Sequence, residues 1–393
     1  MQDPVVILGA ARTPMGAFQG ELSSLSAHDL GGAAIKAAVE RAGIAPGAVD
    51  EVLFGNCLMA GLGQAPARQA GFKGGLPASA GAVTLSKMCG SGMEATLLAH
   101  DQLVAGSRNV VVAGGMESMT NAPHLLLKGR SGIRIGHDRI YDHMMLDGLE
   151  DAYEPGRAMG TFGEQCADKY AFTRAAQDQY ATTSVERAQA AIKSGAFAAE
   201  IAPVSIKTRT GESLISTDES PGKARLDKIA SLKPAFKKDG TITAASSSSI
   251  SDGAAALVLA RSSTAQALGA KPLAKIVGHA TFAQEPEWFT TAPVGAVQKL
   301  LEKIGWQVGD VDLWEINEAF AVVPMAAMHE LGLDHAKVNV NGGACALGHP
   351  IGASGARIIV TLIYALKARG LKKGVATLCI GGGEGTALAV EII

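Results

Sequence analysis

Cys89 stands in a sequence context from which a thiol could act as a nucleophile. It begins the segment CGSGMEATLLAHDQLVAG, in which an apolar helix is predicted to start directly after the cysteine. A thiol at a helix N-terminus lies at the positive end of the helix dipole, which should lower its pKa below the ordinary value of about 8.5. The sequence therefore predicts a reactive thiolate at Cys89, against the alternative of a buried and inert cysteine.

Two further side chains could take part in acid–base chemistry. His349 lies in GGACALGHPIGASG, and Cys379 lies in LCIGGGEG, where three glycines leave backbone N–H groups open to an anion. An imidazole beside a thiol can act as the base that activates it. Taken singly, however, His349 could be a satisfied polar residue and Cys379 a core residue.

Two other motifs allow more than one interpretation. Asn317 and Glu318 end a predicted strand in WEINEAFA, which indicates a site, although Asn317 could equally cap or turn the chain. The segment GSGMEA after Cys89 fits the dinucleotide pattern GxGxxA. The preceding VTLSKM carries Ser and Lys where a buried first strand should be apolar, and no acid follows about 20 residues on. A nicotinamide site is therefore not expected.

An internal repeat predicts how these distant residues come together. Residues 33–56, shifted by 262 positions, align without gaps with residues 295–318. At the same offset Gly90 falls on Gly352, close to His349. Equivalent turns of a duplicated fold should face each other across a pseudo-twofold axis, so His349 should lie beside Cys89. The identical pairs in the aligned segment are Glu40 and Glu302, Gly43 and Gly305, Gly47 and Gly309, Val49 and Val311, and Asp50 and Asp312.

The local pattern predicts an α/β fold. A first strand is predicted at Val5–Gly9, which is continuously apolar, as in sheets buried on both faces. A helix is expected at Ala27–Ala42, ended by Gly43, and a strand follows at Glu51–Phe54. We expect one half at 1–120 plus 244–270, an insertion at 121–243 and a second half at 271–393. Within the insertion, 162–194 is predicted to be a helical pair. Residues 207–238, a basic run, include eight basic and four acidic residues. They could form either a solvated face or a binding site for the phosphates of a nucleotide-like ligand.

Composition narrows the class of protein. The chain has 393 residues, enough for two or three domains, and its net charge of −2 argues against non-specific nucleic-acid binding. No apolar run approaches the roughly 20 residues of a membrane helix, and no signal sequence is evident. The five cysteines include no CxxC pair, which fits neither a disulfide framework nor a zinc site. We therefore expect a cytoplasmic protein with free thiols and no bound metal.

Five sequence blocks resemble the signature blocks of thiolases, specifically the acetyl-CoA acetyltransferase group. In order they are KMCGSGMEA, VVAGGMESM, INEAFA, NVNGGACALGHPIGASGAR and LCIGGGEG, and the resemblance runs from Val5 to the last residue. It implies the thiolase fold, which has two duplicated αβαβα-type halves and an inserted loop domain, assembled as a homotetramer. It also implies a reversible Claisen condensation of two acetyl-CoA molecules to acetoacetyl-CoA and coenzyme A.

The same resemblance implies roles for individual residues. Cys89 would carry the acyl group, His349 would activate it, and Cys379 would exchange the proton at the α-carbon. Asn317 would hold a water that forms one oxyanion hole with His349, and the backbone N–H groups of Cys89 and Gly381 would form the other. Coenzyme A would be a substrate and product, with no tightly bound cofactor. Its expected contacts are Ser248, Met159, Ala319, Phe320 and Lys228.

Some positions depart from the family pattern and keep the acyl-chain length open. The block that commonly reads NASGIND is SSSSISD here, with Ser249 in place of a glycine. Ala158 stands where the short-chain group tends to have His, and Phe289 lies where a Met is often found. We expect a narrow pocket for short chains. The alternatives are a degradative 3-ketoacyl-CoA thiolase of broader chain length and a non-catalytic acyl-CoA binding protein.

Overall fold

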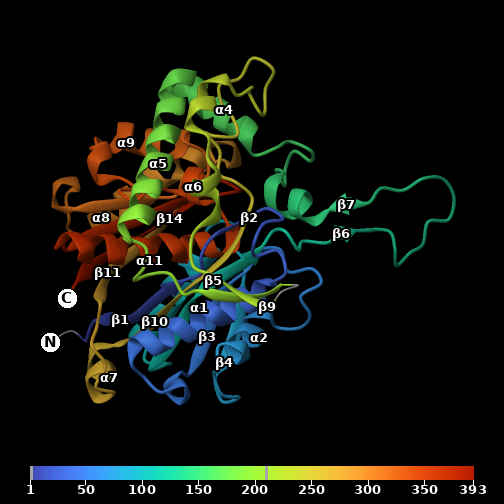
Figure 1. Cartoon of the computed structure of the whole chain (residues 1–393). Coiled ribbons are helices and arrows are strands. Elements are labelled where there is room, and N and C mark those ends of the chain that lie inside the picture. Colours follow the sequence, from blue (N-terminus) through green and yellow to red (C-terminus); the bar gives the residue numbers. More distant parts are fainter. Residues whose placement is uncertain (1–2, 209–210) are drawn as a thin grey trace.

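The computed structural model describes residues 3–208 and 211–393, which fold around one large mixed sheet (Figure 1). Its strand order is β12-β13-β14-β11-β1-β10-β5-β3-β4, with β2 paired to β10. The strands of its first part are β1 (Val5–Arg12), β2 (Gly16–Ala17), β3 (Glu51–Gly55), β4 (Gly81–Leu85), β5 (Val110–Ser118) and β10 (Ser251–Arg261). Those of its second part are β11 (Ala274–Ala283), β12 (Leu313–Ile316), β13 (Lys373–Ile380) and β14 (Glu384–Ile392).

The order of the strands is symmetric about the pair β1 and β11. These two strands are antiparallel, with Ile7 opposite Ala274. On one side of this pair, β1 is followed by β10, β5 and β3, and on the other side β11 is followed by β14, β13 and β12. The last two strands named in each series, β5 and β3 or β13 and β12, are parallel to each other. Gly43 and Gly305 end equivalent helices with φ of 66° and 69°. The predicted duplication is confirmed.

The helices lie in three layers that alternate with the two parts of the sheet. The central layer is α3 (Ser91–Val104) and α11 (Ile351–Arg369), which pack with the inner faces of both parts of the sheet in one apolar core. On the outer face of the first part lie α1 (Ala27–Ala42) and α2 (Pro66–Lys73). On the outer face of the second part lie α8 (Ala292–Ile304) and α9 (Val322–Leu331). The layer order αβαβα is therefore formed by the two halves together. The remaining short elements here are α7 (Ser262–Ala267), α10 (Ala344–Leu347), η1 (Pro46–Ala48), η4 (Pro286–Thr291), η5 (Val308–Asp310) and η6 (His335–Lys337).

The helix α11 is buried along most of its length, and only its last turn is exposed. Among the described residues it alone is long and apolar enough to cross a membrane, with a mean hydropathy of 1.4 over its best window. The expectation that no apolar run approaches this length is therefore corrected. However, 83% of that window is buried inside the protein, which is the environment of a core helix.

Between β5 and β10 the chain forms the insertion, which contains the predicted helical pair as α4 (Gly160–Tyr170) and α5 (Arg174–Ser194). Figure 1 shows the segment between β6 and β7 projecting far from the body. The exact domain boundaries stay predictions, and residues 209 and 210 of the basic run lie outside the described residues. The other elements are β6 (His124–Leu125), β7 (Tyr141–Asp142), the π-helical turn η2 (Met145–Leu149), β8 (Val204–Thr208), β9 (Gly211–Ile215), α6 (Glu219–Lys223) and η3 (Leu226–Ser231).

Candidate active site

Glycines let the helices α3 and α11 approach each other closely. A Cβ at Gly92 would lie 2.8 Å from the backbone N of Ala356, and one at Gly355 would collide with Met93 of the facing helix. A Cβ at Gly90 would collide with Ile380. The space at Gly90 and Gly92 is therefore filled by neighbouring protein segments. The close packing brings the turns before the two helices to one cavity.

This cavity has a volume of about 360 Å³ and contains both Cys89 and His349. Its wall is mainly apolar, as is usual for a site that binds a small molecule. Among the predicted site residues, Gly381, Ser248, Met159, Ala319 and Phe320 also line it. The other lining residues are Met88, Leu146, Asp147, Gly148, Leu149, Glu150, Asp151, Ala152, Tyr153, Phe289, Ile351 and Gly382.

The turn that carries Cys89 is held under strain. Met88 has φ of 44°, in the left-handed region that a side chain disfavours. Ser91 fixes the turn, because its hydroxyl donates to the carbonyl O of Met88 at 2.7 Å and accepts from the backbone N of Lys87 at 2.8 Å. Backbone strain of this kind is often found at functional sites, where surrounding contacts maintain it.

The Cys89 thiol is neutral in the free protein. Burial raises its pKa to about 11, although the backbone N–H groups of Gly381 and of Cys89 itself act in the opposite direction. The prediction of a lowered pKa was therefore wrong, because desolvation of the thiolate exceeds the effect of the nearby helix end. The thiol needs a base in order to react.

His349 is in the right state to serve as that base. Its side chain is buried, and burial together with the positive charge of Arg357 lowers its pKa to about 3, so the imidazole is neutral. Its Nδ1 lies 2.6 Å from Oγ of Ser354 and 3.5 Å from Nδ2 of Asn317. Among the described residues, Nε2 of His349 and Oδ1 of Asn317 have no hydrogen-bond partner. These buried atoms are therefore available to a substrate or a water.

Cys379 lies just behind the cavity wall. Its side chain is fully buried and does not line the cavity, whereas Gly381 and Gly382, which follow it, do. Burial raises the pKa of its thiol well above the ordinary value, and the neighbouring Cys89 raises it further.

The unusual serine block connects two parts of the site. The backbone N of Ser248 donates to the carbonyl O of Ala319 at 3.0 Å, and the backbone N of His349 donates to the carbonyl O of Ser249 at 3.1 Å. Because backbone atoms make both hydrogen bonds, the contact between this loop and the histidine turn does not depend on the side chain of Ser249. The structure gives no account of why serine replaces glycine there.

Like Cys379, the residues Asn317, Lys228 and Glu318 do not line the cavity. Lys228 is exposed on η3 and is not part of the wall. Glu318 is buried, and its carboxylate accepts hydrogen bonds from Tyr180 at 2.9 Å, Ser184 at 2.7 Å and the backbone N of Cys345 at 3.0 Å. Glu318 therefore joins α5 to α10 and is occupied by protein donors.

Sequence reasoning missed one whole wall of the cavity. The segment 146–153 of the insertion contributes a continuous series of lining residues. It carries no periodicity or catalytic motif, so only its position shortly before Met159, a predicted contact, could have indicated it. Met88 was missed as well, since its backbone conformation cannot be read from the sequence.

Comparisons with known proteins agree with this geometry. The models of the thiolase N-terminal and C-terminal domains match residues 5–263 and 270–392. An acetyl-CoA acetyltransferase of Thiocystis violacea is 49% identical over 100% of both chains. The solved acetyl-CoA acetyltransferase from Syntrophomonas wolfei is 42% identical with a TM-score of 0.97 over 100% of both chains. A thiolase from Ascaris suum in complex with coenzyme A is 44% identical, with a TM-score of 0.93 over 99% of this chain and 100% of that one. The chain therefore has the thiolase fold and belongs to the thiolase family.

Proposed function

We propose that the chain is an acetyl-CoA C-acetyltransferase that condenses two acetyl-CoA molecules into acetoacetyl-CoA and coenzyme A, reversibly, through an acetyl group on Cys89. One observation carries the proposal: the thiol of Cys89 and the unpartnered Nε2 of His349 belong to the same cavity wall. The full-length relatives with this name support the choice of substrate.

In the acylation step, Cys89 attacks the thioester carbon of the first acetyl-CoA. Since the resting thiol and imidazole are both neutral, the proton passes from Cys89 to Nε2 of His349 as the sulfur attacks, not before. The backbone N–H groups of Cys89 and Gly381 stabilise the oxyanion. Coenzyme A leaves as a thiolate and takes the proton of Cys379, which leaves Cys379 as a thiolate.

In the condensation step, the Cys379 thiolate removes a proton from the α-carbon of the second acetyl-CoA. Burial makes this thiolate a stronger base than an exposed one, which suits so weak an acid. A water held by Asn317, together with His349, stabilises the enolate oxygen. The enolate carbon attacks the acetyl group, the C–S bond to Cys89 breaks, and the Cys89 sulfur recovers its proton from His349.

The decisive experiment uses Cys89→Ala and mass spectrometry. Wild-type protein incubated with acetyl-CoA should gain one acetyl group per chain on the peptide that contains Cys89, and should form acetoacetyl-CoA. The variant should lose both reactions while still binding coenzyme A. If the wild type neither becomes acetylated nor cleaves acetoacetyl-CoA, a non-catalytic acyl-CoA binding protein is the correct interpretation.

The chain-length range separates the proposal from a degradative 3-ketoacyl-CoA thiolase. The buried ring of Phe289 lines the cavity together with Met159 and Phe320, which supports a short acyl pocket. Thiolysis of the C4 ketoacyl-CoA should therefore be much faster than that of the C8 compound. Equal rates would show that the enzyme has the broader, degradative specificity.

We propose Lys228 as a contact for the phosphates of coenzyme A, on the basis of its exposure and its place in the basic run. Three other basic residues nearby, Lys223, Arg225 and Lys237, form ion pairs with carboxylates. Lys228→Gln should raise the KM for acetyl-CoA without lowering kcat, and more strongly at low salt. Lys36→Gln, at an exposed position on α1, is the control.

We also propose a homotetramer and a cytoplasmic location. The projecting segment between β6 and β7 exposes five large apolar side chains, which supports its burial against another copy of the chain. All five cysteines are free, as expected in a reducing compartment. Light scattering should give a tetramer for the wild type and a smaller species for a variant with Ile135 and Ile140 replaced by Ser. The exposed side chains are Leu126, Leu127, Ile133, Ile135 and Ile140.

A further inference from the structure

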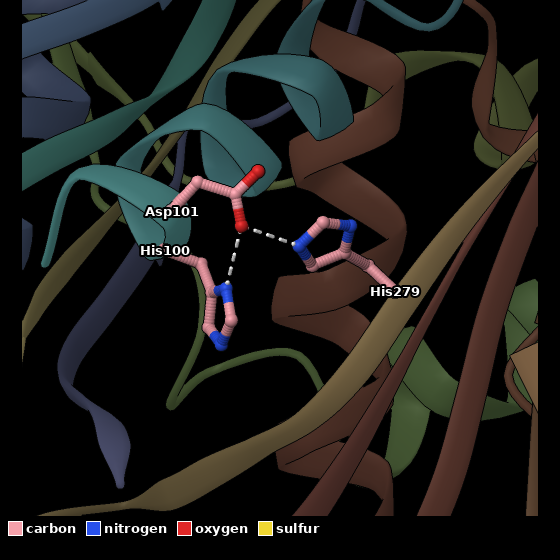
Figure 2. A group of neighbouring side chains, drawn as sticks. All are labelled: His100, Asp101 and His279. Carbon is pink, nitrogen blue, oxygen red and sulfur yellow. Dashed lines mark hydrogen bonds and ion pairs between the residues drawn. The ribbon is translucent and has the colours of Figure 1, made fainter. Parts of the chain in front are cut away.

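A second group of ionisable side chains lies outside the active-site cavity, between the two halves of the fold (Figure 2). His100 and Asp101 lie near the end of α3, and His279 lies on β11. Nδ1 of His100 and Nε2 of His279 are 3.1 Å and 2.9 Å from the same oxygen, Oδ1 of Asp101. The two imidazole rings meet edge to face with their centroids 5.0 Å apart.

This group has the chemistry of a three-ligand transition-metal site. Its ligand atoms, two imidazole nitrogens and a carboxylate oxygen, all lie within 4.8 Å of one another. Ligands at about 2.0–2.2 Å from a tetrahedral zinc ion are separated by roughly 3–3.6 Å, so small side-chain rotations would suffice. Imidazole and carboxylate are ordinary ligands of zinc. We propose that His100, Asp101 and His279 bind one Zn²⁺ per chain, which links α3 to β11.

Exposure of the group leaves a route for the ion. The side chains of His100 and His279 are 18% and 13% exposed, whereas that of Asp101 is 59% exposed. The fixed imidazoles therefore form the inner side of the site, and the carboxylate faces solvent. A fourth position remains for water, as in zinc sites with three protein ligands.

Both imidazole nitrogens that would bind the ion lie at hydrogen-bond distance from the same carboxylate oxygen of Asp101. On binding, Zn²⁺ would replace the two N–H···O hydrogen bonds, and each imidazole would carry its proton on its other nitrogen.

Nearby charges act in opposite directions. The carboxylate of Glu94 interacts electrostatically with that of Asp101 from the same helix, which favours a cation. Nζ of Lys303 donates to the backbone O of His279 at 3.1 Å and brings a positive charge close to the site. Lys303→Gln should therefore strengthen Zn²⁺ binding, whereas Glu94→Gln should weaken it.

The competing explanation is a hydrogen-bonded clamp that holds α3 against β11 without a metal. Titration of the chelator-treated, full-length protein with Zn²⁺ against a chromophoric chelator separates the two. The wild type should bind one ion per chain, and His279→Gln and His100→Gln should each lose more affinity than the roughly 10–100-fold that removal of an outer-shell partner costs. His124→Gln, at an exposed histidine on β6, should bind like the wild type.

Thermal unfolding gives an independent test. Zn²⁺ should raise the Tm of the wild type and of His124→Gln, but not that of His100→Gln or His279→Gln, because an ion raises the Tm only when it binds the native state more tightly than the unfolded chain. Failure of the wild type to bind Zn²⁺ would support the clamp and overturn the proposal. Unchanged binding in both histidine variants would place the ion elsewhere, for example on a cysteine thiol, and would also overturn it. Both tests are independent of the enzyme's activity.

Discussion

Nδ1 of His349 and Oγ of Ser354 lie 2.6 Å apart at the start of α11, and the same hydroxyl lies 2.9 Å from the carbonyl O of Pro350. Because a serine hydroxyl has a single proton, it can donate to Nδ1, or it can donate to Pro350 and accept from Nδ1–H. The second arrangement leaves Nε2 free to accept the proton of Cys89, and Nδ1–H still donates to the hydroxyl when Nε2–H acts as an oxyanion donor. Ser354 can therefore support both roles of His349.

Ser354→Ala should lower kcat by about 10–100-fold with little change in KM, because the imidazole loses the contact that orients it. Alkylation of Cys89 by iodoacetamide should slow in parallel, since it needs the thiolate. Thr361→Val is the control: it removes a buried hydroxyl from the same helix, one that bonds Glu200 at 3.1 Å, away from the site. Equal losses of kcat in both variants would show that Ser354 has only a structural role.

The order of elements and the pairing of the two halves could be predicted from the sequence. The helix at Ala27–Ala42 and its end at Gly43 follow from local periodicity and from a left-handed glycine, both of which are properties of a short segment. The match of residues 33–56 with 295–318 predicted the symmetry and hence the meeting of Cys89 with His349. Self-similarity carries this long-range information because equivalent segments occupy equivalent places.

The electrostatics of the site could not be predicted in the same way. The pKa of Cys89 depends on how far the thiol is removed from water, which is decided by segments as distant as Gly381. The zinc-type cluster joins Asp101 to His279, 178 residues away, so no spacing could reveal it. The wall at 146–153 is positioned by tertiary packing. These features depend on the assembled fold and not on any local pattern.

Glu117 connects the two turns of the active site. Its buried carboxylate accepts from the backbone N of Cys57 at 3.0 Å and from that of Gly352, at the start of α11, at 2.9 Å. The thiol of Cys57 in turn lies 3.2 Å from the carbonyl O of Met88, in the turn that carries Cys89. Glu117→Gln replaces one accepting oxygen by an amide NH₂ group, which cannot accept a hydrogen bond from a backbone N–H. The lost hydrogen bond should lower the free energy of unfolding by about 1–3 kcal/mol. It should also lower kcat, as shown by steady-state assays.

A matched control separates the loss of stability from the loss of activity. Glu164 is equally buried and accepts backbone hydrogen bonds from Thr241 and Ile242, both at 2.9 Å, within the insertion. Glu164→Gln should lower the Tm by a similar amount but retain kcat. A normal kcat in Glu117→Gln would contradict the proposed link between the two turns.

The neutral, buried His349 should make the protein less stable in acid. Its folded-state pKa is lowered to about 3 from a usual value of 6.5, so below pH 6.5 the unfolded chain binds a proton that the folded chain does not. This contribution is fully present above pH 6.5 and is lost as the pH falls toward 3. Between pH 7 and pH 5 it amounts to about 2 kcal/mol of unfolding free energy.

Urea unfolding at pH 7 and pH 5 measures this effect by difference. Contributions from other groups are common to the wild type and to His349→Gln, so they cancel. The wild type should lose about 2 kcal/mol more than the variant between the two pH values. Equal losses would mean that the folded protein protonates His349 near its usual pKa, and the neutral base assigned here would be wrong.

The ring of Phe289 should limit the length of the acyl chain. It is buried, lines the cavity, and packs edge to face on Phe162 with a centroid distance of 6.1 Å. Phe289→Leu should raise kcat/KM for the C6 and C8 ketoacyl-CoA substrates relative to C4 by about tenfold or more, because added pocket space accommodates extra methylenes. Phe236→Leu is the control, since Phe236 packs edge to face on Phe320 but does not line the cavity. If both variants keep the wild-type ratio, the chain length is set elsewhere, and the segment 146–153 is the next wall to test.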